Sequence, residues 1–171
     1  MPEIQRYLSV RSRATKALMS RLRTITFDNG YSTEFNTVWI NNSQVERADN
    51  PPEIYLLFGR SVITDKSNTQ YWEDADVEIW FIVPSLTEDK NEEYDLAVYD
   101  ILSAINPCNE AIYEGTESYE VWIDAREHQP HYQTGQERLI WGRIRCGMKY
   151  FYLRDDHTRW DITDTPVLKE D

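Results

Sequence analysis

Three segments of this chain alternate apolar and polar residues with a period of two, which is the pattern of a half-buried β-strand. The first segment covers residues 71–84, the second about 119–126 and the third about 140–152. The apolar side of the first is formed by Ala75, Val77, Ile79, Phe81 and Val83. Because each segment has one apolar and one polar side, the three predict a sheet with one face against a core.

Two helices are predicted to cover that core. The first runs from about Ser9 to Arg23, where apolar residues recur at helical spacing and basic residues occupy the other side. The second follows Ser85-Leu86-Thr87-Glu88, which fits a capping box, and ends before Asn106-Pro107. Its apolar stripe is formed by Tyr94, Ala97, Val98, Ile101, Leu102 and Ile105.

Shorter patterns complete the element order. Thr37–Ile40 reads as a strand, and residues 54–58 read as a strand that is apolar on both sides and ends at Gly59. Residues 65–70 are predicted to be a polar loop, and residues 127–136 a polar hairpin tip.

The order helix, strands, helix, strands predicts an α+β fold, with an antiparallel or mixed sheet packed by two main helices. A chain of 171 residues is most simply one domain. We assign that domain to residues 1–153 and a C-terminal arm to residues 154–171, which lack any period.

The formal net charge of −12 is unevenly distributed. Residues 1–25 hold six bases and one acid, so the remaining residues hold 12 bases and 29 acids. An acidic body disfavours broad nucleic-acid binding, while the basic first helix could touch an acidic partner or a neighbouring copy. Cys108 and Cys146 lack metal or redox spacing and suggest a reduced, cytosolic protein. No apolar run is long enough to predict a membrane span.

Two rows of charge stand out on the alternating strands. Acidic side chains form one row and basic side chains form the other: Asp74, Asp76 and Glu78 against Arg143, Arg145 and Lys149. The acidic row could hold a divalent cation, although alternate residues on a strand lie about 7 Å apart. The rows could instead pair with each other inside the chain, or meet across a subunit interface.

The sequence offers no catalytic motif, and we expect neither an enzyme nor a bound cofactor or metal. His128 and His131 fall in the predicted hairpin tip, and His157 follows two aspartates without a nucleophile motif nearby. Glycine-rich phosphate loops and nucleophile elbows are absent from the sequence.

The segment Ile25-Thr26-Phe27-Asp28-Asn29-Gly30-Tyr31-Ser32-Thr33 follows the first helix and contains a turn signal at Asn29-Gly30. This order of helix, turn and strand, together with the residues of the segment, resembles the N-terminal part of tail terminator (tail completion) proteins of long-tailed bacteriophages. The resemblance implies a small α+β subunit that forms a hexameric ring, caps the tail tube and joins it to the head or neck. DNA would pass through the ring without sequence-specific binding.

The resemblance also implies partners and a location. The partners would be other copies of the chain, the tail tube protein and a neck or head-completion protein, in the host cytoplasm during assembly and then in the virion. The charged rows are the candidate subunit interface. The candidate contacts to the tube or neck are Tyr71, Trp72, His131, Tyr132 and Trp160. Alternatives are another neck protein, a monomeric protein-binding adaptor and a metal-dependent hydrolase.

Overall fold

The alternating segments form a single mixed β-sheet in the computed structural model. The structure describes residues 10–40, 50–66, 70–105, 112–114, 117–131 and 138–153. The strands are β1 (Thr37–Ile40), β2 (Glu53–Lys66), β3 (Gln70–Pro84), β4 (Ile112–Glu114), β5 (Glu117–His131) and β6 (Leu139–Leu153). Their order across the sheet is β1-β2-β3-β6-β5-β4, and β1 runs parallel to β2 while the other neighbours are antiparallel.

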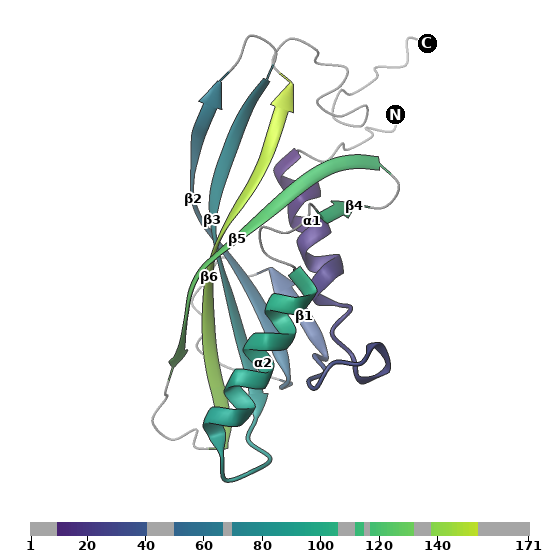
Figure 1. Cartoon of the computed structure of the whole chain (residues 1–171), viewed down its shortest axis with the longest axis vertical. Coiled ribbons are helices and arrows are strands. Elements are labelled where there is room, and N and C mark those ends of the chain that lie inside the picture. The colour runs from purple at the N-terminus through teal and green to yellow at the C-terminus, as the bar shows by residue number, and fades with distance from the viewer. Residues whose placement is uncertain are drawn as a thin grey trace, which may run out of the picture.

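Two helices, α1 (Val10–Leu22) and α2 (Lys90–Ile105), pack on one face of this strongly twisted sheet (Figure 1). The predicted apolar side of β3 is buried in the shared core, as is the stripe of α2 except for the half-buried Leu102. The predicted α+β fold is therefore confirmed. In the part of the chain that the structure describes, neither helix is long and apolar enough to cross a membrane.

The other face of the sheet carries the charged rows and a small apolar cluster. Tyr55, Ile82 and Trp141 are buried there, with Trp80 and Leu139 packed against them. Glu53 is also buried, and its carboxylate accepts a 2.7 Å hydrogen bond from the hydroxyl of Tyr55. The charged residues thus share their face with a dry region at one end of the sheet.

The prediction that a strand ends at Gly59 is wrong. β2 continues to Lys66, and its register against β3 shifts between Phe58 and Ser61. Gly59 therefore lies at a β-bulge, where a strand bends without ending. The predicted loop at residues 65–70 is correspondingly shorter, because both of its ends are strand, while residues 67–69 lie outside the described part.

The predicted hairpin tip at residues 127–136 is also partly wrong, because β5 continues to His131. The register between β5 and β6 shifts between Ala125 and Glu127, so Arg126 is an extra residue in the strand. Such a bulge moves the alternation by one position, which makes the continuing strand look irregular in sequence. Pro130 is tolerated because the described pairing of β5 with β4 does not extend beyond Val121.

The capping box assigned to Ser85–Glu88 is wrong as well. The carboxylate of Asp89 accepts hydrogen bonds from the backbone N–H groups of Asn91 (3.1 Å) and Glu92 (3.0 Å), so Asp89 is the N-cap of α2. Glu93 reaches back further, and its Oε1 accepts from the N–H groups of Leu86 (2.7 Å) and Thr87 (2.6 Å). The loop before α2 is therefore held by carboxylates from the helix start.

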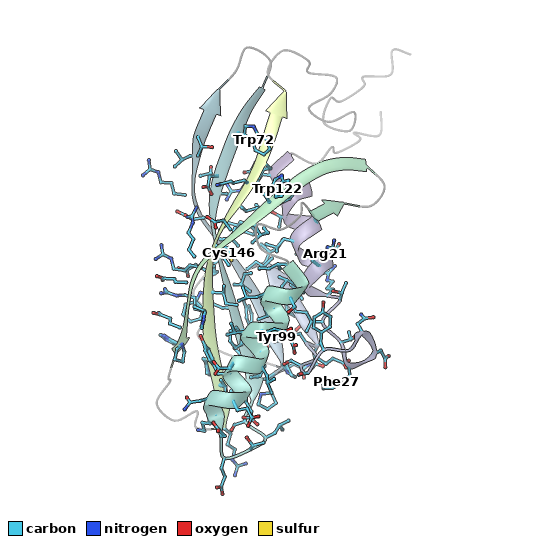
Figure 2. All side chains as sticks on the ribbon, viewed as in Figure 1. Arg21, Phe27, Trp72, Tyr99, Trp122 and Cys146 are labelled. Atoms are coloured by element: carbon cyan, nitrogen blue, oxygen red, sulfur yellow. The ribbon has the colours of Figure 1, made fainter. Side chains whose placement is uncertain are left out.

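Several sequence assignments lie outside the described residues. These are the arm at 154–171 with His157 and Trp160, the remainder of the hairpin tip with Tyr132, and Cys108. Cys146 is buried in the core (Figure 2).

Candidate functional site

The two predicted rows of charge lie side by side on the face of the sheet that is turned away from the helices. β3 and β6 are neighbours, and their register places Asp74 opposite Lys149 and Glu78 opposite Arg145. The rows therefore complement each other within one chain. Lateral pairs of this kind stabilise a sheet by a few tenths of a kcal/mol each.

Arg126, which the bulge in β5 adds to this face, is the centre of the first ionic cluster. Its guanidinium donates to Asp76 Oδ1 at 2.8 Å and to Asp74 Oδ2 at 2.9 Å, and it lies 3.6 Å from Asp124. Burial alone lowers the pKa of Arg126, but the charges of the three aspartates outweigh it and raise the pKa above the usual value. The cluster therefore holds Arg126 as a permanent cation across three strands.

The position of Arg126 depends on Gly147, which lies opposite Asp76 on β3 and opposite Asp124 on β5. A Cβ atom at residue 147 would overlap the guanidinium and come within 2.7 Å of Asp74 Oδ1. The missing side chain on β6 thus opens the path by which Arg126 reaches β3.

Glu78 and Glu127 form a second ionic cluster with two arginines of β6. Arg143 lies 3.4 Å from Glu78 and 3.5 Å from Glu127, and Arg145 lies 3.2 Å from Glu127. The Nε1 of Trp80 donates to Glu78 at 2.9 Å, and Arg143 lies over the Trp80 ring. Side chains from three strands are therefore fixed relative to one another.

These contacts bear on two of the alternatives for the acidic row, because they show which cations its carboxylates face inside the chain. The guanidinium of Arg126 lies between Asp74 and Asp76, and Glu78 is paired with Arg143. The row is engaged in pairing inside the chain. A role for this face in a subunit contact stays a prediction.

Of the candidate tube or neck contacts, the structure describes the side chains of Trp72 and His131, and these two lie far apart on the sheet. Trp72 is half-buried near the start of β3 (Figure 2). His131 is exposed and pairs with Trp141 on β6, and Trp141 pairs in turn with Ile82 near the end of β3. Ten strand residues separate the two levels, or about 33 Å. The structure describes only the backbone of Tyr71, and Tyr132 and Trp160 lie outside it.

The two described histidines act in packing contacts rather than together. The Nδ1 of His128 lies 3.0 Å from the hydroxyl of Tyr94, which ties β5 to α2. His131 meets Trp80 edge to face at 5.1 Å on the opposite side of the sheet. The two side chains point to opposite faces of the sheet because successive strand residues alternate, and residue 131 is three positions after residue 128.

The segment Ile25–Thr33 forms a compact turn after α1. Thr26 caps the short helix η1 (Phe27–Asn29), and its hydroxyl accepts from the N–H of Asn29 at 3.3 Å. The side-chain amide of Asn29 donates to Thr24 O at 2.8 Å. Gly30 then adopts φ = 86°, a left-handed conformation that glycine reaches without steric cost. The turn signal at Asn29-Gly30 therefore has a direct structural basis.

This turn is attached to α2 by one buried carboxylate. Asp100 is 2% exposed, and its Oδ2 accepts a 2.7 Å hydrogen bond from the backbone N–H of Thr33. The apolar stripe of α2 gives no sign that Asp100 is buried, because a polar residue between stripe positions looks solvent-exposed in sequence. The sequence likewise gave no role to Leu86, Leu96 and Tyr99, which are exposed, and the first two line a hollow together with Phe27 of the turn.

Compared with known proteins, the chain matches no family model and no curated protein sequence.

Proposed function

We propose that the chain is a structural assembly protein of a long-tailed bacteriophage, a tail terminator subunit that forms a hexameric ring. The ring would cap the finished tail tube and join it to the head or neck. The single observation that carries this proposal is the segment Ile25–Thr33, whose amino-acid sequence resembles the corresponding segment of that family. In this chain its residues build a capped turn between α1 and the sheet.

The arrangement of the domain supports the proposal. Both helices cover one face of the sheet, and the charged clusters fix side chains of β3, β5 and β6 on the other. An assembly subunit benefits from such a rigid surface, because little side-chain entropy is lost when it is covered.

The acidic balance of the chain is consistent with a channel for DNA. With a net charge of −12, the ring would repel phosphates and let DNA slide without being held. The proposed partners are other copies of the chain, the tail tube protein and a neck or head-completion protein. The proposed location is the host cytoplasm during assembly and the neck of the virion afterwards. Catalysis is not part of this proposal.

The test is the light-scattering mass of the purified chain, alone and mixed with tail tubes from the same source. A sixfold mass, or electron micrographs with density on tube ends, supports a terminator. An unrelated acidic protein of similar size mixed with the same tubes is the control. A persistent monomer of 20.3 kDa that leaves the tubes uncapped overturns the proposal and favours a monomeric adaptor.

A further inference from the structure

A cluster of exposed apolar side chains surrounds a hollow beside the Ile25–Thr33 turn. Phe27, Leu86 and Leu96 line this hollow, whose volume is about 240 Å³ and whose walls include Val83 and Pro84. Phe27 is 63% exposed and Leu86 is 83% exposed. Small-molecule pockets usually measure about 300–1,000 Å³, so this hollow better suits a side chain from another protein. We call it the acidic hollow, for the charges described next.

The surroundings of the acidic hollow carry negative charge. The two segments that build most of it, residues 24–36 and 85–99, hold seven acids and one base. Glu34 and Glu93 line the hollow itself, and exposed Asp95 directly precedes the lining residue Leu96 on α2. Figure 2 shows Tyr99 and Phe27 on the same side of the molecule. A partner for this surface should therefore offer apolar side chains together with positive charge.

The same chain carries a surface of that kind between α1 and β1. Residues 10–23 hold five bases and no acid. Exposed Arg23 lines a second hollow of about 530 Å³ together with Met19, Trp39 and Ile40. Trp39 and Ile40, on the edge strand β1, are each about half exposed. We call this the basic edge.

We propose that the acidic hollow receives the basic edge of a second copy of this chain, with Trp39 or Ile40 entering between Phe27, Leu86 and Leu96. Arg23 would then approach the carboxylates around the hollow. The charge complementarity of the two surfaces, both with exposed apolar residues, is the argument for a second copy as the occupant. When each copy uses its two surfaces on different neighbours, the contact repeats, and it gives a ring where the rotation closes and an open filament where it does not. In this respect the inference rests on the proposed function and assigns its subunit contact.

The experiment measures mass against protein concentration, at low and high salt, for a set of charge variants. Arg23→Glu and Asp95→Lys each replace an attraction between the two surfaces by a repulsion, and we expect each to weaken association roughly tenfold or more. When one chain carries both changes, position 23 is negative and position 95 is positive. The two surfaces then attract each other again, and we expect association to recover. Leu86→Ser removes an apolar side chain that lines the hollow and is 83% exposed, so it should weaken association without loss of folding.

Two control variants match these changes. Arg60→Glu alters the net charge as Arg23→Glu does, at an exposed position on β2 outside both surfaces, and should leave association unchanged. Arg145→Glu reverses a charge on the ion-paired face of the sheet. Circular dichroism of each variant separates lost association from lost folding.

Each outcome has a defined meaning. Weakening by both single changes with recovery in the double variant supports the inference. A sixfold mass then agrees with the proposed function, whereas a dimer retains the contact and overturns the ring. Association that responds to Arg145→Glu but not to Arg23→Glu or Asp95→Lys overturns the inference while the proposed function stands. A monomer at low salt and at every concentration also overturns the inference.

Discussion

Gly147 on β6 lies directly beneath the guanidinium of Arg126 on β5, and a methyl group at position 147 would stand 2.9 Å from the Cζ atom of that arginine. Because Gly147 has no side chain, the side chain of Arg126 can extend from β5 across β6 to β3. Arg126 thereby reaches Asp74 and Asp76 on β3. The ionic cluster and the absent side chain form one feature of the sheet.

Gly147→Ala is expected to destabilise the protein by about 1 kcal/mol, because it displaces Arg126 from partly exposed ion pairs. Arg126→Ala should have a similar effect. Urea unfolding of the two single variants and the double variant measures the coupling. We expect Gly147→Ala to cost clearly less in the Arg126→Ala background. Strictly additive losses would show that the glycine serves another purpose.

Gly142→Ala is expected to be more damaging, by roughly 2–3 kcal/mol, because the change overpacks the core. A Cβ atom at residue 142 would overlap the ring of Phe81, which is fully buried between the sheet and the helices. Arg126 could move aside into solvent, but Phe81 has no such freedom. Thermal unfolding of the Gly142→Ala and Gly147→Ala variants makes the comparison. Equal midpoints would contradict it.

The fold was predictable where one period continued without interruption. β3 and the stripe of α2 keep their spacing from end to end, so their buried sides could be read from sequence. The full lengths of β2 and β5 could not, because a bulge in each strand shifts the alternation. In the sequence, the bulge in β5 is marked only by two consecutive charged residues, Arg126 and Glu127, where strict alternation would place one.

The candidate site was predictable only in part, because the two rows were identified but Arg126 and Glu127, which join them from β5, were not. The two rows of charge are evident from spacing, yet their pairing depends on β6 lying beside β3, which no local pattern determines. The acidic hollow depends on which apolar residues stay uncovered. Leu86 and Phe27 become conspicuous only through their exposure in the folded chain.

Asp89→Ala is expected to destabilise the protein by about 1 kcal/mol, because Asp89 satisfies the first free N–H groups of α2. Ser85→Ala is the matched control. Its hydroxyl contacts only Thr87 O, at 3.2 Å in an exposed loop, among the hydrogen bonds described, so its loss should be nearly neutral. Chemical unfolding of both variants ranks the two residues. A larger loss for Ser85→Ala would restore the capping box that the sequence suggested.

Asp100→Ala is expected to loosen the turn after α1, because it leaves the half-buried N–H of Thr33 without its buried acceptor. An unpaired buried group of this kind costs about 1–3 kcal/mol. Asp100→Asn keeps an oxygen acceptor at nearly the same place, so it should lose much less. Amide hydrogen exchange at Thr33, compared with a core amide such as that of Ile79, separates local opening from global unfolding. Faster exchange confined to the turn in Asp100→Ala, with near-normal protection in Asp100→Asn, would show that this one carboxylate attaches the Ile25–Thr33 segment to α2. Unchanged protection at Thr33 in both variants would mean that packing alone holds the segment.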